Sequence, residues 1–515
     1  MRLSRKNGAR PSSRDPGSPG LAAEGAGGHE RAQADRPLNP FSKHLRSWME
    51  ARTEPPAACS AMRLRARWAR GCGQILIVLA LAAIPVCCLA QTADPTAAPV
   101  DGEAQNLAFH VQATSVSQYH PAFTSPFKGA NSLDPSSNGR TTNDLTLYFG
   151  FRPWKGGEVW LDPELDQGFG LSDTVGVAGF PSGEAYKVGK STPYLKLPRL
   201  FLRQTVDLGG DRVKVDPDQT VLAGTESANR LVLTVGKFSV VDIFDTNRYA
   251  HDPRGDFMNW ALIDTGTYDY AADAWGFTYG AAAEWYQGRW TLRAGLFDLS
   301  IAPNSPTLDD RFGQFQYNAE VERRYQLGGR PGAIRLTGFL TRARMGDLAE
   351  ALRQAQIVGG PPSLAAVRHY ASRSGLSLNL EQQLSDNLGL FIRAGAADGH
   401  EEIYEFSDID QTVAAGLSLN GSGWGRAGDT LGLAAVVNQI SRLRQAYLQA
   451  GGMGILIGDG RLPHEGPESI VEADYNWAVV PAIHLTFDYQ FIANPAYDGD
   501  RGPVSVFGLR VHAQY

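Results

Sequence analysis

The stretch Pro503–Tyr515 (PVSVFGLRVHAQY) places apolar and polar side chains at alternating positions. Phe507 and Leu509 fall on one face, and Arg510 and His512 fall on the other. A period of two is that of a β-strand, because successive Cβ atoms point to opposite sides of the pleat. An exposed apolar edge strand in a soluble protein would invite pairing with other chains. A strand of a membrane-spanning β-barrel instead needs one face in lipid and one in water, so we expect this stretch to close such a barrel.

The same alternation recurs through residues 106–515. Regular segments lie at 107–114, 145–152, 275–285, 290–296, 315–322, 334–341, 390–394, 471–477 and 484–491. Less regular segments near 157–166, 199–208, 230–241, 374–384, 410–420 and 428–440 bring the expected number to about sixteen strands. After residue 105 the sequence has no run of even about a dozen apolar residues, so we expect no transmembrane helix. The predicted fold class is therefore all-β, a transmembrane antiparallel β-barrel of about sixteen strands.

The connections between these segments alternate in length. Long connections are expected near 120–143, 167–198, 242–271, 301–311, 344–373, 398–409, 441–466 and 494–502, with short ones between them. Only 209–229 breaks the pattern, being long where a short turn is expected. Short periplasmic turns and long outer loops are typical of outer-membrane barrels. A soluble β-sandwich or propeller is the alternative, because its strands alternate as well.

The first 105 residues differ in character from the rest. Residues 62–90 have an arginine-rich start, an apolar run and small residues, which predicts a secretory signal peptide cleaved after Ala90. Residues 91–105 form a small polar linker, and residues 1–61 are a mis-called start or a disordered extension. All four cysteines precede residue 91, so no disulfide is expected in the barrel.

Charge is distributed just as unevenly. Residues 1–90 hold 14 of the 48 Lys and Arg and 6 of the 54 Asp and Glu, which leaves the remainder with a net charge of −14. A chain this acidic is a poor match for nucleic acid, and we expect no nucleic-acid partner.

Several runs in residues 105–515 are family-specific. They are VGKFSVVDIFD from Val235 to Asp245, the segments 256–285, 290–300 and 311–325, and the ending 494–515. In these runs the chain resembles the carbohydrate-selective porins of the OprB type. The resemblance implies an outer-membrane barrel through which mono- or disaccharides diffuse passively into the periplasm. It also implies two partners. One is outer-membrane lipid, and the other is the assembly machinery, which recognises the last strand, ending at Tyr515. A homo-oligomer of barrels is an open alternative to a single one.

About sixteen strands leave an aqueous channel, so selectivity requires a constriction. The first candidate is the 242–271 connection, which combines six aspartates with aromatic residues and includes Trp260 and Asp264. Aromatic faces can stack on the apolar faces of sugars, and ionic groups bind hydroxyls strongly. An ordinary outer cap with acidic decoration is the alternative interpretation.

The second candidate is the polar wall of the barrel. Its expected pore-lining residues are Arg203, Arg293, Arg335 and Arg393, together with Glu284, Glu320, Glu322 and Asp474. Opposed cationic and anionic groups would set up a transverse field that favours polar, uncharged solutes. These residues could equally be the solvated face that any porin has.

Other functions have weaker support. A general porin for small polar solutes is the main alternative, and an enzyme built on a barrel is a lesser one. The ten histidines form no recognisable catalytic arrangement, so we expect no enzyme. Asp498–Asp500 lacks the rest of a calcium loop, so neither a metal nor a cofactor is expected.

Overall fold

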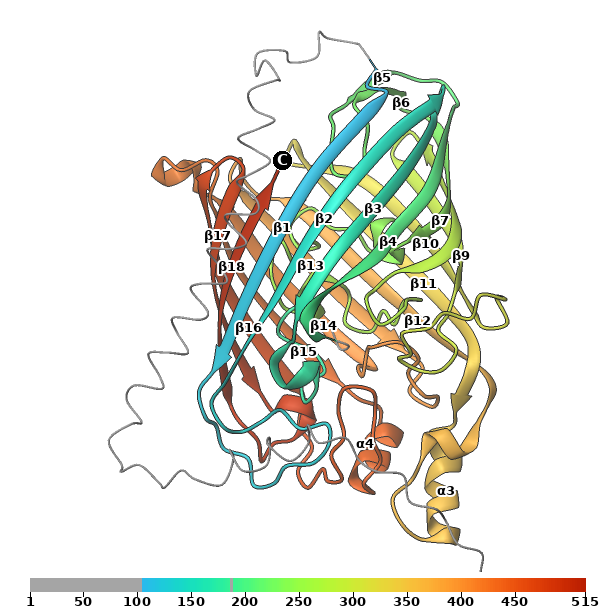
Figure 1. The fold of residues 1–515 in the computed structure, drawn as a ribbon, viewed down its shortest axis with the longest axis vertical. Helices are drawn as coiled ribbons and strands as arrows, with labels where there is room; N and C mark the ends of the chain where they lie inside the picture. Colours follow the sequence, from blue (N-terminus) through green and yellow to red (C-terminus); the bar gives the residue numbers. More distant parts are fainter. Residues whose placement is uncertain (1–103, 186–188) are drawn as a thin grey trace, which may run out of the picture. The chain divides into compact units, whose positions relative to one another are not determined.

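The computed structural model describes residues 104–185 and 189–515, in which sixteen strands form one closed antiparallel barrel (Figure 1). The strands are β1 (Leu107–His120), β2 (Asn138–Trp154), β3 (Gly157–Gly168), β4 (Lys190–Asp207), β7 (Arg230–Phe238), β8 (Thr278–Gln287), β9 (Trp290–Asp298), β10 (Phe315–Leu327), β11 (Arg330–Gly346), β12 (Arg368–Gln383), β13 (Leu388–Ala397), β14 (Gln411–Asn420), β15 (Thr430–Gln439), β16 (Glu468–Val480), β17 (Ile483–Ala493) and β18 (Val504–Gln514). The barrel closes where β1 pairs with β18, in register from Gln112 opposite Gln514 to Tyr119 opposite Phe507. The predicted fold class is confirmed.

Burial alternates along the strands as the sequence predicts. On β11, Leu336 and Leu340 are 47% and 43% exposed, whereas Arg335 and Thr337 between them are buried. On β18, Phe507 is likewise exposed and Arg510 buried. Apolar side chains therefore face the lipid, and polar side chains face the lumen.

Connections alternate between the two ends of the barrel. Short turns join β2 to β3, β8 to β9 and β10 to β11, whereas the connections after β1, β3, β7, β9, β11, β13, β15 and β17 are longer. The exceptional connection 208–229 contains a separate hairpin of β5 (Arg212–Val215) and β6 (Gly224–Ser227), which pair only with each other. Because short turns are periplasmic in such barrels, this hairpin lies on the periplasmic side.

Helices occur only in the connections of the described residues. They are α2 (Trp260–Ile263), α3 (Leu348–Val358) and α4 (Arg442–Gln449), with 3-10 turns η2 (Leu171–Thr174), η3 (Val240–Asp242), η4 (Leu364–Val367), η5 (Gly421–Trp424) and η6 (Pro495–Tyr497). Asp347 and Ser441 cap the start of α3 and α4, because their side chains accept hydrogen bonds from backbone N–H groups of the first turn. In the part of the chain that is described, no helix is long and apolar enough to cross a membrane.

One predicted strand starts later in the structure than in the sequence prediction. The segment predicted as a strand from residue 275 begins at Thr278, because Gly276 has a positive φ of 97° and the Asp273 side chain accepts from the N–H groups of Trp275 and Phe277. The extension 1–61, the signal peptide 62–90 and residues 91–103 of the linker lie outside the described residues.

Candidate pore constriction

Residues 239–277, which connect β7 to β8, fold into the barrel, and we call them the inner loop. The Asn247 side chain donates to Asn379 on β12 at 2.7 Å, and the Asn259 backbone N–H donates to Glu472 on β16 at 2.9 Å. These partners lie on the lumen face of strands distant from β7 and β8 around the barrel. The inner loop therefore crosses the lumen and narrows it.

Charged side chains of the wall hold the backbone of the inner loop. Glu320 accepts from the Asp245 N–H at 2.8 Å, and Arg393 donates to the carbonyls of Leu262 and Asp245 at 2.6 and 3.1 Å. Arg510 donates to the carbonyls of residues 253, 255 and 256. A buried backbone polar group without a partner is costly, so these contacts fix the path of the loop.

Aromatic packing supports the same arrangement. Trp260 stacks on Phe180 with ring centroids 5.4 Å apart and meets Phe406 edge-on. Phe257 packs against Phe391 of β13 with ring centroids 5.6 Å apart. Trp260 is only 3% exposed, so most of its surface serves packing.

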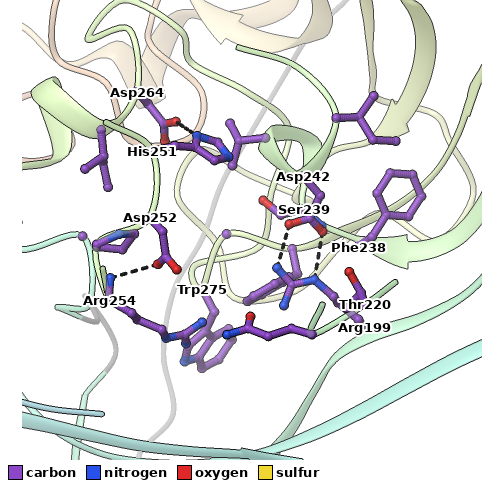
Figure 2. Close-up of a pocket in the computed structure, with 18 of the residues that line it drawn as sticks. Arg199, Thr220, Phe238, Ser239, Asp242, His251, Asp252, Arg254, Asp264 and Trp275 are labelled. Carbon is purple, nitrogen blue, oxygen red and sulfur yellow. Dashed lines mark hydrogen bonds and ion pairs between the residues drawn. The ribbon is translucent and has the colours of Figure 1, made fainter. Parts of the chain in front are cut away.

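An open cavity of about 350 Å³ remains between the inner loop and the wall formed by β3, β4 and β7. Figure 2 shows the side chains around it, with Arg199 directed at Asp242 and His251 at Asp264. The charged residues that line it are Glu164, Glu184, Arg199, Arg203, Asp218, Asp242, Asp252, Arg254 and Asp264. Space for a small molecule is thus bounded by ionic groups of both signs.

Acidic and basic side chains oppose each other across β3 and β4. In the register, Asp162 lies opposite Arg199 and Glu164 opposite Lys196. The Lys196 ammonium lies 3.3 Å from the Asp166 carboxylate, and Arg199 makes two hydrogen bonds to Asp242 at 2.9 and 2.7 Å. One strand therefore presents a column of carboxylates that pairs with a column of cations on its neighbour, and Glu164, Arg199 and Arg203 of these columns line the cavity.

Arg254 supplies the main positive charge from the inner loop. Its guanidinium lies 3.3 Å from both Glu164 and Glu184 and 3.7 Å from Asp144. Three carboxylates thus share one cation at the point where the loop meets the wall.

Aromatic surface borders the same space. The Trp275 indole donates to the Tyr194 hydroxyl at 3.0 Å. The Lys196 ammonium lies 4.5 Å from the centre of the Trp275 ring. Trp275 is only half-buried, unlike Trp260, so it offers more open aromatic surface to the cavity.

The residues predicted for the site fall into two groups. Arg203, Trp260 and Asp264 line the cavity. Arg293 pairs with Glu284, Glu320 and Glu322 at 3.1, 2.6 and 3.0 Å, and Arg335 pairs with Glu322 at 3.0 Å. Arg393 is fully buried beneath the inner loop, and Asp474 is buried on β16. This second group lies on the lumen face but does not line the cavity.

Several lining residues were not predicted. Among these, Glu164 shares the two-residue period of the acids at 158, 162 and 166, and Arg199 shares that of the predicted Arg203 on the next strand, so the sequence carried a signal for both columns. Arg254 and Trp275 had no comparable signal, because their positions depend on the fold of the inner loop. Among residues 104–185 and 189–515, no three His, Cys, Asp or Glu side chains are grouped to hold a metal ion.

Comparison with known proteins identifies the family. The model of the carbohydrate-selective porin, OprB family, matches residues 130–515. The high-pH structure of Pseudomonas putida OprB is similar, with a TM-score of 0.60 at 15% identity over 80% of this chain and 94% of that chain. The outer membrane channel DcaP of Acinetobacter baumannii has a TM-score of 0.43 at 13% identity over 79% and 97% of the two chains. A search of curated proteins finds no match. Since the family match spans most of the barrel, the chain belongs to the OprB family of carbohydrate-selective porins of the outer membrane.

Proposed function

We propose that this porin passes neutral mono- and disaccharides by passive diffusion through the cavity between the inner loop and β3–β4. The observation that carries the proposal is the inner loop itself, which crosses the lumen and leaves about 350 Å³ open beside paired ions and aromatic surface. That volume falls within the roughly 300–1,000 Å³ range of small-molecule sites.

The chemistry of the cavity matches that of a sugar. A hydroxyl group can donate to a carboxylate and accept from a guanidinium, so alternating acids and bases suit a ring of hydroxyls. The half-buried Trp275 offers an apolar surface for the CH face of the ring. Inorganic ions have no such faces and meet charges of both signs.

We assign different roles to the predicted pore residues. Arg203 contacts the passing solute, because it lines the cavity and its side chain keeps 23% of its surface exposed. Trp260 and Asp264 also line the cavity but are only 3% exposed, so they shape its wall. Arg293, Arg335, Arg393, Glu284, Glu320 and Asp474 act through the wall and the inner loop, and so set the width of the channel. The protein performs no catalysis in this proposal.

Planar-bilayer recording and liposome swelling test the proposal. Sugars should block the current in a saturable way, and liposomes should swell faster in sugars than in other neutral solutes of equal size. Swelling rates that follow solute size alone would favour a general porin instead. Chemical conversion of the added sugar, without any conductance, would favour an enzyme built on a barrel.

We also propose that β18 carries the signal for assembly and that barrels associate as homo-oligomers. Tyr515 is joined to β1 by two backbone hydrogen bonds with Val111, at 2.8 and 2.9 Å, and its side chain is exposed. Deletion of Tyr515 should therefore impair insertion into the membrane more than the conductance of inserted barrels. Native electrophoresis of the extracted porin would measure the oligomeric state.

A further inference from the structure

The tip of the β5–β6 hairpin, residues 216–223, folds against the lumen, and we call it the exit segment. Among the connections between described strands, it belongs to the one that is long on the periplasmic side. Figure 1 shows β5 and β6 at the end of the barrel opposite to α3 and α4. A short turn would suffice to connect β4 to β7, so the additional residues are not needed to close the barrel.

Two arginines of the wall hold the backbone of the exit segment. Arg203 donates to the Thr220 carbonyl at 2.7 Å, and Arg152 donates to the Leu222 and Ala223 carbonyls at 3.4 and 3.3 Å. Both arginines also pair with Glu158 between them, at 3.3 and 2.9 Å. The exit segment is thus tied to three neighbouring strands, β2, β3 and β4.

Further contacts fix its last residues and its middle. Ala223 exchanges two hydrogen bonds of 3.0 Å with Gln105, and Leu222 is almost fully buried. The side-chain amides of Gln219 and Gln112 of β1 lie 2.5 Å apart, within hydrogen-bonding distance. The segment therefore lies along the wall from β4 to β1 and does not hang freely from the rim.

The exit segment separates two cavities. Asp218 and Gln219 line the 350 Å³ cavity beside the inner loop. The same two residues line a second cavity of about 330 Å³, which is bounded by Tyr148, Ala482 and the end of the chain. Because Ala482 lies in a short periplasmic turn, the second cavity is at the periplasmic mouth.

We propose that the exit segment is a second constriction, in series with the inner loop, and that Gln219 and Asp218 bind sugar hydroxyls as the solute leaves. The binding of sugar rests on the proposed function, whereas the narrowing of the mouth does not. An amide both donates and accepts hydrogen bonds, and a carboxylate accepts them, so the pair can exchange partners with a hydroxylated solute.

A deletion variant tests the narrowing. Gly209 and Gly210 both have positive φ, at 94° and 89°, and Asn229 makes two backbone hydrogen bonds of 3.0 Å with this turn, to Leu208 and Gly209. Removing residues 211–228 joins Gly210 to Asn229 and leaves a two-residue turn, for which positive φ at both positions is favourable. This variant should keep the barrel and lack only the hairpin.

Single-channel conductance with neutral polyethylene glycol on one side is the measurement. Deletion should raise conductance by up to about twofold, the limit for two equal resistances in series. Polymers that the native channel excludes from the periplasmic side should then enter and lower the current. Polymer entry from the extracellular side should not change, because the inner loop is intact.

Two point variants keep the test independent of the deletion. Gln219→Trp should lower conductance and slow disaccharides more than monosaccharides. Gln219→Cys, treated with a bulky thiol reagent from the periplasmic side, should lose current. Lys214→Cys is the matched control on the exposed strand of the same hairpin, and its modification should leave current unchanged.

The outcomes separate this proposal from the proposed function. Unchanged conductance and unchanged periplasmic polymer exclusion in both the deletion and Gln219→Trp would overturn the second constriction. If polymer entry changes as expected but no sugar blocks the native current, the constriction stands and sugar binding at Gln219 and Asp218 is refuted.

Discussion

Arg393 on β13 donates a 2.6 Å hydrogen bond to the carbonyl of Leu262, which lies in α2 of the inner loop. The same guanidinium reaches the Asp245 carbonyl at 3.1 Å and lies 3.5 Å from the Asp245 carboxylate. Arg393 and Asp245 are both fully buried. One side chain of the wall thus joins two separate parts of the inner loop and sets its distance from β13.

Arg393→Ala should loosen the inner loop without unfolding the barrel. Removing one partner of a buried ion pair costs roughly 3–5 kcal/mol, because the other charge is left uncompensated. The barrel itself is held by the strand ladders, so the loss falls on the loop. We expect higher and noisier single-channel conductance and weaker block by sugars.

Arg344→Ala is the control for this substitution, because Arg344 is an exposed residue of β11, two strands away from β13. It should leave both conductance and sugar block unchanged. Native conductance in Arg393→Ala would contradict the role assigned to this anchor.

Arg254→Ala should change the charge of the constriction itself. Glu164, Glu184 and Asp144 would lose their shared cation, so the cavity would become more negative. The reversal potential in a salt gradient should shift towards cation selectivity, and less so at high ionic strength because salt screens the charges. Sugar affinity should fall by about tenfold or more, since a hydrogen bond to a charged group contributes roughly 1.5–3 kcal/mol.

Arg248→Ala provides the comparison within the same loop. Arg248 is exposed and is not among the residues that line this cavity. An equal shift of the reversal potential in both variants would show that overall charge, not the position of Arg254, determines ion selectivity.

The barrel could be predicted well from the sequence, because in each strand the side chains that face lipid are apolar and those that face the lumen are polar. Leu336 and Arg335 occupy adjacent positions and are exposed and buried, respectively, as the two-residue period requires. Lipid contact and water contact act on every strand separately, so the pattern can be read without knowledge of the neighbours. The boundary at Thr278 was missed because Trp275 and Phe277 continue the apolar period into a turn.

The site could be predicted only in part, for a different reason. Arg293 and Arg203 have the same strand pattern, yet Arg203 lines the cavity and Arg293 is enclosed by three glutamates. What separates them is the path of the inner loop across the lumen. That path depends on contacts between residues far apart in sequence, such as Asn247 with Asn379, and no local pattern encodes them.

Trp275→Ala should weaken sugar binding while ion conductance is kept or increased. Its ring is half-buried in the cavity wall and is oriented by the hydrogen bond to Tyr194. Loss of an aromatic contact costs roughly 0.5–1.5 kcal/mol beyond the area it buries, which is about a fivefold loss of affinity. Current block by titrated sugar measures the change. Trp424→Ala, at an exposed Trp beyond the end of β14, should have no effect, and equal losses in both variants would contradict the assignment.

The stability of the outer loop that contains α4 should depend on the negative charge of Asp410. This carboxylate accepts from Arg444 at 2.8 and 3.2 Å and from the Ser441 N–H at 2.9 Å. Burial opposes its ionisation, but the Arg444 guanidinium outweighs that effect and lowers the pKa of Asp410. When folding lowers the pKa of a carboxyl group, its charge stabilises the folded state at pH values above the unfolded pKa of about 4. This stabilisation is lost as the pH falls through the folded pKa.

The loop should therefore resist trypsin from neutral pH down to mild acid. Asp410→Asn removes the charge at every pH, so cleavage at Arg442 and Arg444 should become faster at neutral pH. Asp386→Asn is the matched control, because Asp386 pairs with Arg330 in an exposed turn and such pairs contribute only about 0–1 kcal/mol. Equal cleavage of native porin and Asp410→Asn would show that the charge of Asp410 does not hold the loop.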